Sequence, residues 1–223
     1  KACYLKDENP VTTWRQLNKD IQLNVKKLND LCIDILYISG PDVDLKIKLS
    51  PKSAWKGGGG ANIPSFEIFT SPDWRGTNGW IRFNQPLYLY GNVTRDMYLE
   101  FKNGRVVKSS ASSGEHVLKE MIATKNADKI GEFSLTDKNF SKITKAMADT
   151  LYDENIGGKF GNTHIALGAA YRDCYKGDYA KVEEEQWEEL GYNSSSVHTD
   201  IISTTDRTVT ALLADGSEKI IYQ

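Results

Sequence analysis

The sequence predicts an α+β fold, and three patterns along the chain indicate it. Apolar side chains recur at helical spacing over residues 11–31, short strands alternate with turns over residues 66–107, and a strand meander closes the chain over residues 197–222. The chain has 223 residues, of which 39% are apolar and 26% charged. That length is enough to bury a core, as one large domain or two small ones.

The first half begins with an amphipathic helix over residues 11–31. Its apolar side chains recur at steps of three and four, namely Trp14, Leu17, Ile21, Val25, Leu28 and Leu31. Residues 32–38 form a continuous apolar strand, and residues 44–49 alternate charged and apolar side chains, as expected for a strand with one solvent-exposed face. Asn103-Gly104 between two strand patterns predicts a type I′ hairpin.

The second half begins with capping-box spacing at Ser112, which predicts a helix from there onward. His116 lies at the start of this helix, where we expect it to be solvated and not to bind metal. A strand is expected from about Glu132 and a second helix over residues 163–171. Further strands are expected over residues 197–202, 209–213 and 219–222.

Residues 57–60 are four consecutive glycines. They lack the Lys-Ser/Thr pair that completes a phosphate-binding loop, so they predict a flexible or closely packed loop rather than a nucleotide site.

The composition argues against several classes of protein. Twenty-eight Lys and Arg against 30 Asp and Glu give a net charge of −2, which argues against a nucleic-acid-binding protein. No stretch has the roughly 20 apolar residues of a membrane helix, so no membrane partner is expected. The N-terminus has neither a signal-peptide core nor an initiator Met, which indicates a processed or excised chain. Cys3, Cys32 and Cys174 lack metal-binding spacing and favour reduced thiols in a cytoplasmic protein.

Two pairs of side chains have spacings that suit metal binding. His198 and Asp200 lie two residues apart in an expected strand, so they share a face and could contact one metal ion or two adjacent ones. His164 and Tyr171 lie seven residues apart in the expected helix, two turns apart on one face. Each pair also fits an ordinary alternative: a partly exposed strand face for the first, and core or interface packing for the second.

Glu67 and Glu132 lie in expected strands with apolar neighbours. A carboxylate in such a place is costly unless it is paired, hydrogen-bonded or bound to metal, although an edge strand would accommodate each one separately. Together with the two imidazoles and the polar cluster Asp153-Glu154-Asn155, they favour an oxygen-rich two-metal hydrolytic site. A structural zinc site would usually have thiolate ligands instead.

A series of motifs then follows in collinear order along most of the chain. They are Ile63-Pro64 through Phe69-Thr70-Ser71-Pro72, Gly76-Thr77-x-Gly79, Leu99-x-Phe101-x-x-Gly104-Arg105-Val106-Val107, Ile130-Gly131-Glu132, Leu151-x-Asp153-Glu154-Asn155, His164-x-Ala166-Leu167-Gly168-x-Ala170-Tyr171 and a final His-x-Asp. In this order they resemble the M29 family of metallo-aminopeptidases, the thermophilic aminopeptidase type.

The resemblance implies one metal-binding catalytic domain over residues 1–223, with a curved, mainly antiparallel mixed sheet and flanking helices. It implies a metallo-aminopeptidase that hydrolyses the N-terminal residue of a peptide with a metal-activated water. Two divalent cations (zinc, cobalt or manganese) would be held by Glu67, Glu132, His164, Tyr171, His198 and Asp200. Glu132 is the first choice for the glutamate that transfers the proton and Glu67 the second, and Tyr171 is the third candidate catalytic residue.

The chain departs from the family pattern in two respects. Residues 156–163 are longer and richer in glycine than the family's segment. The family's proteins also have an additional N-terminal domain, so the helix over residues 10–31 would follow the junction to it, and a homodimer is expected of the full-length protein. The alternatives are a non-catalytic metal-binding or assembly domain that keeps the fold, and a different hydrolase or structural domain with accidental spacing.

Overall fold

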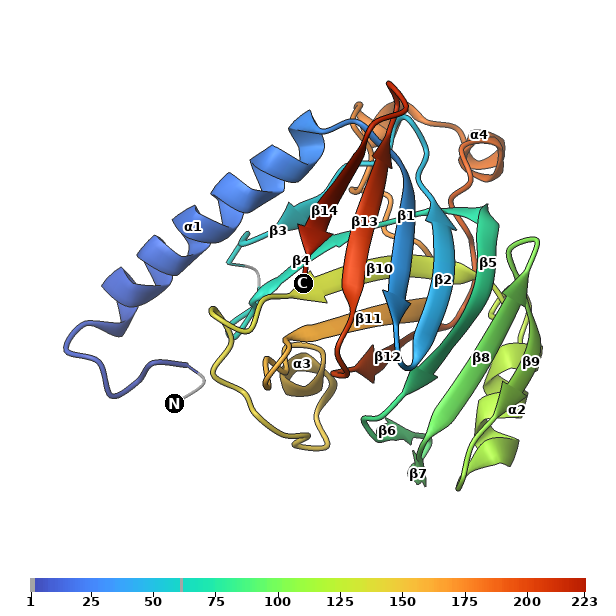
Figure 1. The fold of residues 1–223 in the computed structure, drawn as a ribbon, viewed down its shortest axis with the longest axis horizontal. Coiled ribbons are helices and arrows are strands. Elements are labelled where there is room, and N and C mark those ends of the chain that lie inside the picture. The colour runs from blue at the N-terminus through green and yellow to red at the C-terminus, as the bar shows by residue number, and fades with distance from the viewer. Residues whose placement is uncertain (1–2, 61) are drawn as a thin grey trace.

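Two β-sheets packed face to face form the body of the computed structural model, which describes residues 3–60 and 62–223 (Figure 1). The seven-stranded sheet lies in front of the five-stranded sheet in this view, and the strands of the two sheets cross at a steep angle. Apolar side chains of both sheets share one core, among them Leu36, Leu45, Phe133 and Ile165. None of the described helices is both long and apolar enough to cross a membrane.

The strands of the described residues are arranged in three sheets. The first has the order β14-β13-β1-β2-β5-β8-β9, with β1 (Ile33–Gly40), β2 (Val43–Lys48), β5 (Asp73–Phe83), β8 (Met97–Lys102), β9 (Arg105–Ser110), β13 (Thr208–Leu213) and β14 (Glu218–Tyr222). The second has the order β12-β11-β10-β4-β3, with β3 (Lys56–Gly57), β4 (Glu67–Thr70), β10 (Ile130–Thr136), β11 (Asn162–Gly168) and β12 (His198–Ser203). A separate hairpin joins β6 (Leu87–Leu89) and β7 (Asn92–Thr94).

The long helix α1 (Pro10–Asp30) confirms the first predicted helix. Asn9 caps it, because its side chain accepts a hydrogen bond from the Thr12 N–H, and Pro10 occupies the first turn, where no N–H is needed. The helix lies beside β3 and β4 (Figure 1) and buries the apolar positions that the spacing predicted, namely Trp14, Leu17, Ile21 and Val25. The other helices are short: α2 (Glu115–Ala123), α3 (Thr150–Asp153), α4 (Glu184–Glu189) and a 3-10 turn at Tyr179–Lys181.

The α+β prediction is confirmed, although the strands form two main sheets rather than one and all of their ladders are antiparallel.

The predicted two-residue hairpin joins β8 to β9. Asn103 and Gly104 have φ angles of 50° and 81°, as a type I′ turn requires.

The predicted helix over residues 163–171 is wrong, because Asn162–Gly168 form strand β11. β11 lies between β10 and β12, so it pairs on both edges. It is also buried throughout its length. A short apolar run fits a helix and a buried strand equally well by periodicity, and here the two neighbouring strands decide. Tyr171 therefore follows the strand in a turn rather than sharing a helical face with His164.

The cap predicted at Ser112 for the helix that follows it, α2, also differs from the structure. Gly114 is the N-cap of α2, and no side chain makes a capping hydrogen bond there. The hydroxyl of Ser112 instead donates to Asp96 at 2.6 Å, which ties the loop before α2 to the end of β7.

Strand β10 contains a bulge at Gly131. Ile130 lies opposite Leu167, whereas Glu132 lies opposite Ala166, so one extra residue is accommodated on β10. Residues two apart in a regular strand share a face, but the bulge lets Ile130 enter the core while Glu132 faces away from it. A Cβ on Gly131 would lie 2.1 Å from the Ala169 carbonyl oxygen, so only glycine fits.

Candidate metal centre

Five of the six predicted ligands lie on the face of the five-stranded sheet that points away from the seven-stranded sheet. They are Glu67 on β4, Glu132 on β10, His164 on β11, and His198 and Asp200 on β12. Strand alternation explains this placement, since the residues next to them, such as Ile68 and Ile165, point into the shared core. The pairing of β11 with β10 and with β12 brings Glu132 and Asp200 to the same level of the sheet, because both lie opposite Ala166.

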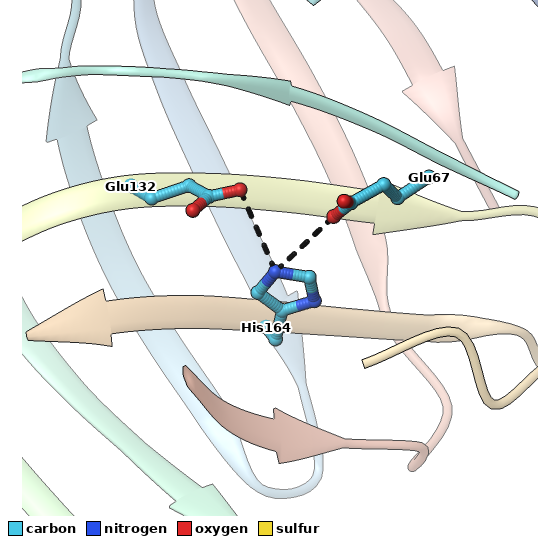
Figure 2. A group of neighbouring side chains, drawn as sticks. All are labelled: Glu67, Glu132 and His164. Atoms are coloured by element: carbon cyan, nitrogen blue, oxygen red, sulfur yellow. Dashed lines mark ion pairs between the residues drawn. The ribbon is translucent and has the colours of Figure 1, made fainter. Parts of the chain in front are cut away.

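His164 is the centre of the first group of side chains. Its Nε2 atom lies 3.4 Å from Glu67 Oε2, 3.6 Å from Glu132 Oε1 and 3.9 Å from Asp200 Oδ1. Figure 2 shows Glu67 and Glu132 reaching toward this nitrogen from neighbouring strands. The His164 side chain is 1% exposed, so bulk water cannot compensate these charges.

His198 is the centre of a second group that shares Glu132 with the first. Its Nε2 atom lies 3.2 Å from Glu132 Oε2 and 3.5 Å from Asp200 Oδ1. Glu132 therefore directs one carboxylate oxygen toward each imidazole. The sharing makes the two groups one continuous centre.

The hydrogen bonds around the centre hold its donor atoms in place. His198 Nδ1 lies 2.8 Å from the Ala169 carbonyl oxygen, so Nδ1 donates there and Nε2 faces the carboxylates. The Ser134 hydroxyl donates to Glu67 Oε2 at 2.9 Å. Two atoms that could bind a metal ion, His198 Nε2 and Asp200 Oδ1, are buried and make no hydrogen bond within the described residues.

These orphaned atoms fit a bound cation. Buried carboxylates and an unprotonated imidazole nitrogen repel one another unless a proton or a metal ion lies among them. The donor set mixes nitrogen and oxygen, which suits zinc, cobalt or manganese.

Tyr171 lies at the edge of the centre. Its ring is 4.6 Å from the His198 ring and 5.5 Å from the Phe69 ring, and its side chain is partly exposed. Its backbone N–H donates to the Ser71 hydroxyl, which fixes the turn after β11. Burial, and then the charges of Glu132 and Asp200, raise the pKa of the Tyr171 phenol, so it remains protonated in the absence of a cation.

A cavity of about 520 Å³ opens beside the centre, and its lining includes Glu67, Glu132, Tyr171 and Asp200. Glu154 also lines it and was not among the predicted ligands. Burial, followed by the charge of Glu67, raises the pKa of Glu154 to about 9. The acidic cluster at residues 153–155 was the available signal, but a polar cluster next to glycines is equally typical of a surface loop.

The neighbouring residues of this cluster support the sheet. The Asn155 carboxamide oxygen accepts the Phe66 N–H at 2.6 Å, immediately before Glu67, and its Nδ2 donates to Leu151 O. Asn155 therefore couples the C-terminal end of α3 to the start of β4.

A profile described as "Thermophilic metalloprotease (M29)" matches residues 1–223. The chain belongs to the M29 family. It is similar to Aminopeptidase AmpS of Bacillus subtilis (strain 168), with 32% identity over 100% of this chain and 56% of the relative. It is also similar to Aminopeptidase T of Thermus aquaticus, with 31% identity over 97% of this chain and 54% of the relative. The solved structure of wild-type AmpT from Thermus thermophilus has a TM-score of 0.84 and 30% identity, over 95% of this chain and 54% of that chain.

The M29 chain thus spans about half the length of the curated relatives it matches. The family assignment made from the motifs is confirmed, and so is the fold class. The roles of the six residues and the number of metal ions stay predictions.

His116, the remaining histidine of the M29 chain, lies on α2 rather than on the five-stranded sheet that carries the centre. It is exposed on α2, which packs against β7 and β9, and it belongs to neither group of metal-binding side chains. We expect His116→Ala to leave the bound metal unchanged, whereas His198→Ala lowers it. Metal content by mass spectrometry checks this, and a loss of metal in His116→Ala would refute the assignment.

Metal uptake by the M29 chain is expected to release protons. Burial lowers the pKa of both imidazoles, but the surrounding carboxylates outweigh it and raise the pKa of His164 to about 10 and that of His198 to about 11. Without metal, both imidazoles are therefore protonated at neutral pH, and an incoming cation displaces these protons. Since each displaced proton makes the apparent binding constant rise about tenfold per pH unit, affinity increases with pH.

The same pKa values give the sign of the pH dependence of stability. Both lie above the value of roughly 6.5 in an unfolded chain, so in the metal-free protein the protons stabilise the fold fully below about pH 6.5. That stabilisation is lost as the pH rises through about 10 and 11.

Calorimetric zinc titrations at neutral pH in buffers of different ionisation enthalpy count the protons released on metal binding. A binding heat independent of the buffer would contradict this expectation.

Proposed function

We propose that this M29 chain is the metal-binding catalytic part of an aminopeptidase that hydrolyses the N-terminal residue of peptides with a water activated by two divalent cations. The observation that carries the proposal is the shared carboxylate, since Glu132 directs one oxygen to buried His164 and the other to partly buried His198. Relatives named as aminopeptidases support the substrate class, a peptide with a free N-terminus.

The chain's own side chains divide between two cation positions. Glu67, Glu132 and His164 would hold one cation, and Glu132, His198 and Asp200 the other. Tyr171 stands beside the second position and would complete the set. Two divalent cations bound there would polarise the scissile carbonyl and lower the pKa of a water shared between them.

A glutamate must carry the proton from the attacking water to the leaving amine. Glu132 was the first choice, but both of its oxygens face imidazoles. Glu67 places Oε2 toward His164 and Ser134, and within the described residues its Oε1 has no hydrogen bond or ion pair. We therefore favour Glu67, which has an oxygen free to accept and return a proton within the cavity.

Turnover by the metal-loaded chain tests the proposed function. The purified chain with zinc, cobalt or manganese should cleave an aminoacyl 4-nitroanilide, because its free amine and scissile carbonyl reach the centre. The Nα-acetylated form of the same reporter should not be cleaved, since it has no free amine. If the chain binds metal but cleaves neither compound, the alternative of a non-catalytic metal-binding or assembly domain holds for this chain.

A further inference from the structure

The glycine stretch of residues 57–60 forms part of the wall of the cavity beside the candidate metal centre. The same cavity of about 520 Å³ is lined by Gly57–Gly60, by Glu67 and Asp200, and by Gln22 of α1. The four glycines run from the end of edge strand β3 toward β4, which carries Glu67. A ligand held at the centre therefore lies in one space with the glycine backbone.

The backbone of this stretch is free to bind a ligand. The Gln22 carboxamide donates to the Gly57 carbonyl, which covers the end of β3. Beyond that point, within the described part of the chain, the N–H and C=O groups of Gly58, Gly59 and Gly60 make no hydrogen bond to backbone or side chain. Three successive residues thus present unpaired donors and acceptors at the cavity.

The protein's own packing does not require glycine at the middle position. A Cβ on Gly58 would lie only 3.0 Å from Asn18 O and from Ile21, and the φ of +62° at Gly58 also favours glycine. Gly60 has a φ of +71°, which favours glycine by conformation. A Cβ on Gly59 would meet nothing within 4 Å, so a side chain at that position would project into open space. Glycine allows a close approach of the backbone to a ligand, and no described residue blocks such an approach at Gly59.

We infer that the Gly58–Gly60 backbone binds the main chain of the peptide substrate beyond its scissile bond. The inference rests on the proposed function, which places the N-terminal end of the peptide at the metal centre. With the N-terminal residue held there, the rest of the substrate leaves along the cavity wall. Main-chain hydrogen bonds to the glycines give affinity that is independent of the substrate's side chains. Because Gly58 and Gly60 have positive φ angles, the three residues form an irregular segment, and their N–H and C=O groups can meet the main chain of a substrate residue without forming a regular ladder.

This arrangement favours oligopeptides over single aminoacyl compounds. A tetrapeptide reaches both the centre and the glycine backbone, whereas an amino-acid hydroxamate reaches only the centre. The loop therefore acts as a positioning element that sets substrate length rather than sequence.

Gly59→Ala tests the inference, because the added methyl group contacts nothing in the protein itself. The probes are an amino-acid hydroxamate and a tetrapeptide whose scissile amide is replaced by a non-hydrolysable methylene-amine, each titrated calorimetrically into the zinc-loaded chain. We expect the Kd of the tetrapeptide to rise about tenfold and that of the hydroxamate to stay unchanged. Equal effects on both probes, or no effect on either, would overturn the inference.

Two controls separate binding from folding. Gly216→Ala adds a methyl group into open space at the β13–β14 turn, where the φ of +85° also strains the backbone, and it should change neither Kd. N-methylation of the third-residue amide of the tetrapeptide should weaken its binding to the wild-type chain to a similar extent. This control changes only the probe and needs no protein variant. If N-methylation leaves the affinity unchanged, the inference is wrong even if Gly59→Ala fails to fold. If both probes bind as expected and the nitroanilide is not cleaved, the proposed function fails and the loop assignment stands.

Discussion

Replacing Glu132 with Gln is expected to remove metal from both positions and to abolish turnover. Glu132 is the one side chain common to both groups, with Oε1 3.6 Å from His164 Nε2 and Oε2 3.2 Å from His198 Nε2. The amide cannot supply two anionic oxygens, so each position loses charge as well as a ligand. The loss in kcat/KM should exceed the roughly 10–100-fold that follows from removing an outer-shell partner of a metal ligand.

Metal content and kinetics together check this result. Glu67→Gln is the matched comparison, because Glu67 belongs to only one group and its loss should spare the position at His198 and Asp200. Glu120→Gln, on the exposed face of α2, should change neither metal content nor rate. A Glu132→Gln chain that retains two metal ions would contradict the shared-carboxylate arrangement. Glu67→Gln that remains inactive at saturating metal would support its role in proton transfer.

Removing metal is expected to lower the melting temperature substantially. Three carboxylates, with side chains between 3% and 12% exposed, converge on the centre, and without a metal ion the two protonated imidazoles balance them only in part. A metal ion at one hundred times its Kd stabilises the native state by about 2.7 kcal/mol per site. For a domain of this size that corresponds to a Tm shift of roughly 5–10 °C per occupied site.

Calorimetric melting with and without a chelator measures this shift, and added zinc, cobalt or manganese should reverse it. His164→Ala and His198→Ala should each reduce the response while leaving the carboxylates in place. Identical melting curves with and without chelator, in protein that carries no metal after purification, would contradict the two-metal proposal while leaving the family assignment intact.

The positions of the five strand-borne residues could be predicted because they depend on short-range alternation and on the order of the motifs. His198 and Asp200 share a face simply because they are two residues apart in β12. Tyr171 is near the centre as the resemblance implied, but the helix expected to carry it is strand β11 followed by a turn. Periodicity over seven residues cannot detect the two neighbouring strands that decide between these structures.

Glu154 and the bulge in β10 could not be predicted for a related reason. Glu154 enters the cavity from the C-terminal end of the short helix α3, where neither spacing nor apolar neighbours single it out. The bulge depends on how β10 meets β11, a contact between segments distant in sequence. Alternation alone would have placed Ile130 and Glu132 on the same face.

The close approach of Gly131 to the Ala169 carbonyl has a consequence for how this chain tolerates mutation. Any side chain at Gly131 would push the two backbones apart at the bulge and displace the adjacent Glu132, which faces both imidazoles. Ala169 is also the residue whose carbonyl accepts the bond from His198 Nδ1, so the same displacement reaches the second imidazole. In a saturation library selected for activity, Gly131 should thus tolerate no replacement and group with the ligands, although it contributes no functional atom of its own.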